Sequence, residues 1–145
     1  MSSRDESYSL LTWRDEHEKI ERRIIAVERA VASSSIRSAS SAIEALAAAI
    51  EGHLSVEERA YLPMVEKLSP RGAEFSAAVQ LAHAQLRESL EQLHELIELA
   101  RWPEAARSFA LLAERFRAHE AEENSFANEV MRLDPDQGRR VLMES

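Results

Sequence analysis

Four long runs of helix-forming residues, separated by three short breaks, constrain the fold of this chain more than any other feature of its sequence. Within each run, apolar residues recur every three or four positions, as in the series Ile20, Ile24, Val27 and Val31. This period places the apolar side chains on one face of an α-helix. The chain has only 3 glycines and 4 prolines in 145 residues, and no run has the alternating pattern of a β-strand. We therefore expect an all-α protein that folds as an up-down-up-down antiparallel four-helix bundle.

The ends of the four helices are predicted from residues that commonly begin and end helices. We expect the first helix at about residues 12–32, followed by a serine-rich turn over residues 33–40. Ser41 and Glu44 have the spacing of a capping box, which predicts that the second helix begins there and continues to about Leu68. Breaks near residues 69–72 and 102–103 then bound a third helix and a fourth, which end near residues 101 and 133. The sequence thus predicts a single domain over residues 1–145, with the bundle at about 11–133 and a short C-terminal tail at 134–145.

Charge and cysteine content exclude several classes of protein. The formal net charge is −8, and the arginines between Arg14 and Arg29 alternate with glutamates, so no basic face for nucleic acid is expected. The absence of cysteine excludes disulfides, thiolate metal sites and cysteine nucleophiles. The first ten residues lack the apolar run of a signal peptide, and no stretch approaches the roughly 18 apolar residues of a membrane span. These features favour a cytoplasmic protein that binds neither nucleic acid nor membranes.

The distances of the histidines from the predicted turns indicate which of them can meet. In an antiparallel hairpin, two residues lie at the same height when they are equally far from the turn. His17 lies 18 residues before Ser35, and His53 lies 18 residues after it. These two histidines are therefore expected at one height in the bundle.

The same comparison extends to the other two turns. Glu57 and His83 each lie 13 residues from Pro70, and His83 and His119 lie 19 and 17 residues from Trp102. At a rise of about 1.5 Å per residue, the mismatches amount to ~3 Å or less. One histidine from each helix is expected in a single layer, with Glu57 and Glu123 within a turn of it. The fifth histidine, His94, lies 11 residues beyond His83 and hence ~16 Å further along the axis, outside the layer.

Four imidazoles and two carboxylates in one layer of a helical bundle favour metal binding. An ionised carboxylate without a partner is costly in a protein interior, whereas a bound cation stabilises it. Nitrogen and oxygen ligands without sulfur suit iron, manganese or zinc. Six protein ligands are too many for a tetrahedral zinc site and fit two metal ions, each with two histidines, that share two bridging carboxylates. The predicted metal ligands are His17, His53, Glu57, His83, His119 and Glu123.

The segment from His53 to Pro63, HLSVEERAYLP, is the most specific motif in the chain. It resembles the second-helix signature of the hemerythrin-like, or HHE cation-binding, domains: a histidine, three residues, two glutamates, then an apolar pair and a proline. The segment from His119 to Asn124 resembles the fourth-helix counterpart of that signature. His17 and His83 match the histidines of the first and third helices.

The resemblance implies a non-haem di-iron centre in which Glu57 and Glu123 bridge the two irons, with an oxo or hydroxo bridge between them. It also implies that His17 and His53 bind one iron and that His83 and His119 bind the other. The family includes oxygen carriers, oxygen or redox sensors, iron-responsive regulators, and proteins that handle peroxide or nitric oxide. Oxygen, peroxide or nitric oxide is therefore the expected small ligand.

One position departs from the oxygen-carrying members of that family. They typically have a second histidine four residues after the first on the third helix, and this chain has Arg87 there, which cannot ligate a metal. The departure favours reactivity, or a replacement ligand, over simple reversible oxygen carriage. Glu21 and Glu88 are the candidate replacements, and Glu21 is the better placed. Tyr61, four residues after Glu57, is expected to point into the bundle near the metals, either as a hydrogen-bonding group or as a core aromatic.

Several functions stay open at this point. The leading hypothesis is a di-iron protein that binds, senses or reacts with oxygen, peroxide or nitric oxide, with an enzymatic activity toward peroxide or oxygen as one form of it. The alternatives are a non-catalytic iron-binding module for storage, delivery or iron-dependent regulation, and a metal-free helical scaffold. A ferritin-like site is disfavoured, because its Glu-x-x-His motif occurs only at Glu91 and His94, outside the layer. The ligand set does not separate iron from manganese or a mixed pair, and the sequence leaves the oligomeric state and the redox partner open.

Overall fold

The computed structural model describes residues 10–133 and, within them, the side chains of residues 15–129. The chain forms four helical rods. The first is α2 (Leu10–Ala32), and the second is made of α3 (Ile36–Val56), the short π-helix η1 (Glu57–Tyr61) and α4 (Leu62–Leu68). The third rod is α5 (Pro70–Glu98), and the fourth is α6 (Trp102–Leu133). The described part of the chain contains no strand, which confirms the all-α prediction.

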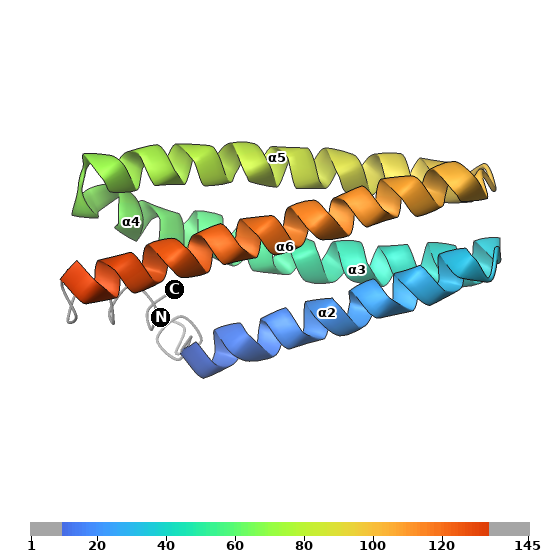
Figure 1. The fold of residues 1–145 in the computed structure, drawn as a ribbon, viewed down its shortest axis with the longest axis horizontal. Helices are drawn as coiled ribbons and strands as arrows, with labels where there is room; N and C mark the ends of the chain where they lie inside the picture. Colours follow the sequence, from blue (N-terminus) through green and yellow to red (C-terminus); the bar gives the residue numbers. More distant parts are fainter. Residues whose placement is uncertain (1–9, 134–145) are drawn as a thin grey trace.

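The four rods lie lengthwise beside one another, and each connection reverses the direction of the chain (Figure 1). Contacts join α2 to α3, α3 and α4 to α5, α5 to α6, and α6 back to α2. The start of α2 and the end of α6 therefore lie at the same end of the molecule. This arrangement fits the predicted up-down-up-down bundle. None of the described helices is both long enough and apolar enough to cross a membrane.

The second rod begins at Ile36 and not at Ser41, so the predicted capping box of Ser41 and Glu44 is wrong. Ser35 is the N-cap, and its side chain accepts a hydrogen bond of 3.3 Å from the backbone N–H of Ser38. The earlier start allows the first turn of α3 to contribute Ala39 to the core. The predicted turn over residues 33–40 is thus confined to residues 33–35.

The third rod starts at a tight junction with α4. Ser69 caps it by accepting a hydrogen bond of 3.0 Å from the backbone N–H of Gly72, and Pro70 occupies the first turn, where its missing N–H costs nothing. Gly72 is buried, and a Cβ atom there would collide with the carbonyl oxygen of Val65. The glycine therefore permits the close approach of α4 and α5.

The third rod ends at Glu98, slightly before the predicted residue 101. Ala100 adopts a left-handed backbone conformation, with φ of 54°. The backbone N–H of Arg101 then donates to the carbonyl oxygen of Leu96 over 3.0 Å, which closes the helix in a Schellman-type turn. The chain can reverse direction there within three residues, 99–101.

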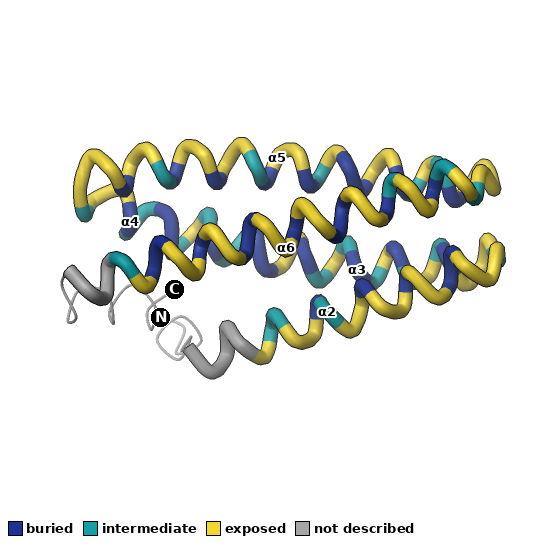
Figure 2. The backbone as a smooth tube through the Cα atoms, viewed as in Figure 1, coloured by how far each residue is buried: buried dark blue, intermediate teal, exposed yellow. Residues whose placement is uncertain are grey.

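The buried residues lie on the inward faces of the rods (Figure 2), and the apolar ones among them form two clusters. The larger cluster runs from the end that carries the turns at residues 33–35 and 99–101, and its members include Ile50, Leu86 and Phe116. The smaller cluster contains Val79 and Phe126. On α5 and α6, the buried histidines and glutamates fall between residues of the larger cluster and residues of the smaller one, and Glu57 falls between Leu54 of the larger cluster and Tyr61 of the smaller. The bundle thus encloses a polar layer with apolar packing on both sides.

Candidate metal centre

Each of the four rods contributes to the buried polar layer. The histidines predicted to lie at one height do come together, in two pairs. The ring centroids of His17 and His53 are 4.9 Å apart, and those of His83 and His119 are also 4.9 Å apart. Each pair meets edge to face. The turn-distance argument therefore located all four imidazoles.

Glu57, His83, His119 and Glu123 form the first cluster of donor atoms, called here the inner group because all four side chains are buried. One donor atom of each residue lies within 4.8 Å of the others. His83 Nε2 lies 3.2 Å from His119 Nε2 and 3.0 Å from Glu57 Oε1. His119 Nε2 lies 3.1 Å from Glu123 Oε1. Nitrogen and oxygen atoms from three rods therefore face one small volume.

His17, His53 and Glu120 form the second cluster, called here the outer group. Both oxygens of Glu120 face it: Oε2 lies 2.8 Å from His17 Nε2, and Oε1 lies 3.2 Å from His53 Nε2. The side chain of His17 is 23% exposed, whereas that of His53 is buried. The outer group thus reaches the surface on the side of α2.

Glu57 connects the two groups. Its Oε1 atom lies 3.0 Å from His83 Nε2 in the inner group, and its Oε2 atom lies 3.4 Å from His53 Nε2 in the outer group. Each oxygen of one carboxylate therefore faces a different pair of imidazoles. This is the disposition of a carboxylate that can bridge two cations.

The sequence argument missed Glu120, and the two glutamates that it offered as replacements for the absent histidine at position 87 do not face the centre. The Glu21 side chain is 43% exposed and accepts hydrogen bonds of 3.0 and 3.3 Å from Arg117. Glu88 is exposed and accepts one from Gln92. A signal for Glu120 was present, since it precedes Glu123 by three residues and so shares a helix face with it. The glutamate next to His119 thus turns toward α2 and α3.

The outward nitrogens of two imidazoles contact further carboxylates. His53 Nδ1 lies 3.2 Å from Glu16 Oε1, and His83 Nδ1 lies 2.6 Å from Glu58 Oε2. A carboxylate on one ring nitrogen fixes the tautomer, so that the other nitrogen presents its lone pair to a metal. Both contacts therefore orient the Nε2 atoms of His53 and His83 for ligation.

Arg87 occupies the place of the second third-helix histidine and supports the inner group indirectly. Its guanidinium donates to Glu58 over 2.8 and 3.0 Å and to Glu51 over 2.8 to 3.0 Å. The Arg87 guanidinium holds the pKa of Glu58 below its usual value, and the contact with His83 acts in the same direction. Arg87 thus keeps the carboxylate that orients His83 ionised and in place.

Burial and mutual contacts shift the pKa values of the buried carboxylates in opposite directions. Burial alone would raise the pKa of Glu57, but contacts with Glu123 and with the imidazoles of His119, His53 and His83 hold it well below its usual value. Burial and the neighbouring Glu57 raise the pKa of Glu123 well above its usual value. Two carboxylates this close do not readily both carry a charge unless a cation lies near them.

The imidazoles respond to the same charges. Burial would lower the pKa of His119, but contacts with Glu123 and Glu57 outweigh it and raise the pKa to about 10. Burial would likewise lower the pKa of His53, but Glu120, Glu16 and Glu57 raise it well above its usual value. The cluster is therefore an environment that favours positive charge.

The residues of both groups fit bound metal ions. Among the side chains that the structure describes, neither carboxylate oxygen of Glu57, Glu120 or Glu123 has a partner in hydrogen-bond geometry, although imidazole nitrogens lie close to them. Buried polar atoms of this kind are costly when they are left without a partner. Cations between the imidazole nitrogens and the carboxylate oxygens would compensate that cost. The donor set is nitrogen and oxygen only, as borderline and hard metal ions prefer.

The second rod changes its helical winding at the polar layer. In η1 the backbone N–H of Leu62 donates to the carbonyl oxygen of Glu57, five residues earlier. Pro63, which has no N–H, follows directly, so no α-helical hydrogen bond to Arg59 can form there. Single π-turns of this kind occur frequently at functional sites. Here the π-turn begins at Glu57 and ends at Tyr61, which sets the directions of both side chains.

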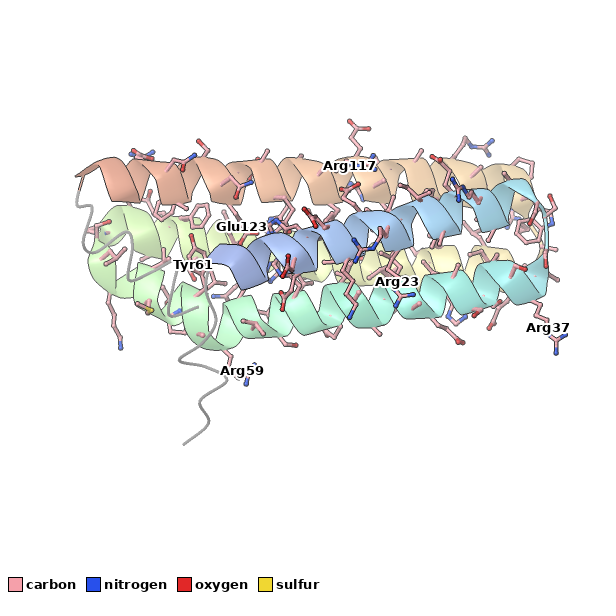
Figure 3. All side chains as sticks on the ribbon, turned by 90° about the horizontal axis from the view of Figure 1, so that it is seen from below. Arg23, Arg37, Arg59, Tyr61, Arg117 and Glu123 are labelled. Atoms are coloured by element: carbon pink, nitrogen blue, oxygen red, sulfur yellow. The ribbon has the colours of Figure 1, made fainter. Side chains whose placement is uncertain are left out.

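Tyr61 lies inside the bundle, as the sequence predicted, and not on its surface. Its side chain is buried, and Figure 3 shows Tyr61 and Glu123 between the helices, whereas Arg37 and Arg59 point away from the bundle. Burial, together with the charges of Glu123 and Glu57, raises the pKa of the Tyr61 phenol. The hydroxyl thus keeps its proton on the side of the inner group.

His94 lies apart from both groups, with Nε2 3.3 Å from Glu98 at the surface, as predicted.

Comparison with known proteins agrees with the residues of the centre. The family model described as hemerythrin HHE cation binding domain matches residues 10–128. No curated protein and no solved structure gives a match to the chain. The matched region covers most of the chain and includes every residue of the inner and outer groups. This protein therefore belongs to the family of hemerythrin HHE cation-binding domains.

Proposed function

We propose that this protein is a non-haem di-iron protein that binds, senses or reacts with oxygen, peroxide or nitric oxide. The observation that carries the proposal is the carboxylate of Glu57, whose two oxygens face the imidazoles of two separate groups. A single metal ion would leave one of those groups without a cation. A cytoplasmic location stays a prediction from the sequence.

The proposed ligands are the six residues predicted from the sequence, with Glu120 added. His83 and His119 would hold one iron, and His17, His53 and Glu120 would hold the other. Glu57 and Glu123 would bridge the pair. Glu57 has the stronger support as a bridge, because its oxygens lie on both sides, while Glu123 contacts His119 and lies near enough to Glu120 for that charge to raise its pKa. Manganese would find the same donors acceptable.

A pair of iron ions bound there would supply one-electron redox chemistry and coordination positions for a small ligand. The chain contributes the surroundings. The two apolar clusters and the burial of all four inner side chains keep bulk water away from the inner group, which strengthens the electrostatic interactions inside it. Glu16 and Glu58 orient the imidazoles, and the Tyr61 hydroxyl holds a proton beside the inner group.

The proposal is tested by expressing the protein in iron-replete medium and measuring its iron content and near-UV spectrum. We expect about two irons per chain and an absorption band that is lost in His53→Ala, because two positions each need their histidines. Glu66→Gln, at an exposed position of α4, serves as the matched control. Fewer than about half an iron per chain would contradict a resident metal centre.

Reaction of the loaded protein with hydrogen peroxide and with nitric oxide then separates two functions. Oxygen evolution from peroxide, or a spectral change with nitric oxide, would support a reactive or sensing centre. Two irons that respond to neither reagent would favour the alternative, a non-catalytic module for iron storage, delivery or iron-dependent regulation.

A further inference from the structure

The inner and outer groups offer different numbers of donor atoms, and this difference decides where a small ligand can bind. The inference rests on the proposed di-iron function. Each group supplies two imidazole nitrogens. The groups differ in the carboxylate oxygens that face those nitrogens.

The outer group has the fuller set of donors. Both oxygens of Glu120 lie within 3.2 Å of its imidazole nitrogens, and Glu57 Oε2 lies 3.4 Å from His53 Nε2. A metal held by His17 and His53 therefore has up to five protein donor atoms close at hand. Such a metal would have few coordination positions left for another ligand.

The inner group has fewer donors. Among the described side chains, its imidazoles of His83 and His119 face one oxygen of Glu57 and one of Glu123 at 3.0 and 3.1 Å. Helical spacing offers one further donor position, four residues after His83 on the same face of α5. Arg87 stands there, and its guanidinium is directed to Glu51 and Glu58 and has no lone pair to donate.

We propose that a small exogenous ligand, such as azide or nitric oxide, binds the metal of the inner group and not that of the outer group. Tyr61 lies on the same side, within reach of the charges of Glu57 and Glu123, and its hydroxyl can donate a hydrogen bond to such a ligand. Glu120 thus adds donor atoms to the outer group, and Arg87 occupies a position where another residue type could have supplied a donor to the inner group.

A surface pocket near the outer group does not oppose this assignment. The pocket has a volume of about 210 Å³ and is lined by residues that include Lys19, Gly52 and His53. Glu16 also lines it and contacts His53 Nδ1, the ring nitrogen that points away from Glu120 and Glu57. The pocket therefore meets the back of the imidazole and not the side that faces the metal donors.

The inference is tested on the iron-loaded, full-length protein with azide as the probe, by spectral titration, with iron content measured for each sample. Arg87→His places an imidazole four residues after His83, so we expect azide affinity to fall about tenfold or more, because azide must then displace a protein donor. Arg87→Gln is the matched control: it also removes the contacts with Glu51 and Glu58 but adds no imidazole. Equal azide affinities for Arg87→His and Arg87→Gln, each with two irons, would overturn the inference.

Two further variants keep the test decisive if Arg87→His loses iron. Tyr61→Phe should weaken azide binding about threefold to tenfold through loss of one hydrogen bond, and an unchanged affinity would count against the inner position. Glu120→Gln should raise the number of azide ions bound per chain, because it opens the outer position. If Glu120→Gln bound two irons and the same number of azide ions as the wild-type protein, the inference that Glu120 closes the outer position would be overturned. Absence of iron from the wild-type protein would instead contradict the proposed function.

Discussion

The inner and outer groups use the same donor chemistry, yet the bundle holds them in different ways. All side chains of the inner group are buried, and its His83 is fixed by Glu58, which Arg87 holds in turn. In the outer group, His17 is 23% exposed, whereas the two carboxylates that contact His53 and His83 are equally exposed, Glu16 at 33% and Glu58 at 32%. A side chain held from several sides loses little further freedom on binding, whereas an exposed one must be ordered first. The inner position should therefore retain its metal more firmly, although it has fewer donors.

The comparison also shows that donor number and rigidity are separate properties of a metal site. The outer group gains the carboxylate of Glu120 but reaches the surface on the side of α2. The inner group is rigid but lacks the donor that position 87 could supply. A position that is firmly held and incompletely ligated is well suited to bind a small ligand, and a fully ligated one is suited to support it.

The largest effect is expected from Glu57→Gln, because Glu57 faces both groups. Neutralising this carboxylate removes the negative charge shared by the imidazoles of His53, His83 and His119, so the metal content should fall from about two ions per chain to fewer than about half an ion. Elemental analysis of the purified protein measures this. Glu66→Gln is the control, and full retention of two ions by Glu57→Gln would mean that the groups are independent.

A clear difference is expected between His83→Gln and His17→Gln. Loss of His83 removes a buried donor from the group that retains metal firmly, and both positions should empty because they share Glu57. Loss of His17 should leave the inner position filled, with about one ion per chain. The two variants are compared by metal content and by thermal unfolding. If His17→Gln lost more metal than His83→Gln, the outer position and not the inner one would be the position that retains its metal more firmly.

A smaller effect is expected from the carboxylates that orient the imidazoles. Glu58→Gln should weaken metal affinity roughly tenfold to hundredfold, as is usual for a carboxylate that positions a ligating histidine. Glu16→Gln should weaken it less, because its contact with His53 is longer, 3.2 Å against 2.6 Å. Competition with a chelator measures both. Glu51→Gln, which removes the other partner of Arg87, is the control, and a loss as large as that of Glu58→Gln would show that Arg87 and not Glu58 positions His83.

The stability of the metal-free protein should fall as the pH rises from neutral to alkaline. The pKa of His119 is raised from its usual 6.5 to about 10, because contacts with Glu123 and Glu57 outweigh burial. A raised pKa in the folded state stabilises the protein fully below the unfolded value, and that contribution is lost as the pH passes from about 6.5 toward 10. Thermal unfolding of the metal-free protein should therefore occur at lower temperatures near pH 10 than near pH 7. His119→Gln should flatten this dependence, and an identical slope in the variant would contradict the link to His119.

The smallest effect is expected at the end of the bundle that carries the turns at residues 33–35 and 99–101, away from both groups. Ala100 has φ of 54°, which glycine adopts more easily than alanine, so Ala100→Gly should raise the free energy of unfolding by about 0.5–1 kcal/mol. Ala106→Gly, at an exposed position within α6, should lower it by about 1 kcal/mol. Chemical denaturation measures both. Neither variant should change the metal content, and a change would show that this end of the bundle and the polar layer are coupled.

The heights of the site residues could be predicted from the sequence because the rods are stiff and the turns are short. Counting residues from Ser35 and from the other turns depends only on the rise of a helix, and the structure has the four imidazoles close together as that count requires. The start of α3 was missed because several serines in succession offered equivalent caps. Only the burial of Ala39 in the core distinguishes the true start, and burial depends on tertiary packing.

The lateral directions of side chains could not be predicted in the same way. Glu120 and Glu21 both carry a carboxylate near the correct height, but Glu120 faces the outer histidines and Glu21 faces Arg117 at the surface. The choice depends on how each rod is rotated against its neighbours. The hydrogen bonds that link Arg87 to Glu58 and Glu58 to His83 likewise run between two rods, so no spacing within one helix predicts them. The π-turn at Glu57 had one local signal, Pro63, which alone does not specify it.

The central claim is that two metal ions lie in this layer, one in each group. Anomalous X-ray diffraction from crystals of the iron-loaded protein tests it most directly. We predict two peaks about 3.5–4 Å apart, one among His17, His53 and Glu120 and the other among His83, His119 and Glu123, with Glu57 between them. A single peak in the layer, or iron bound only at surface carboxylates, would contradict the account.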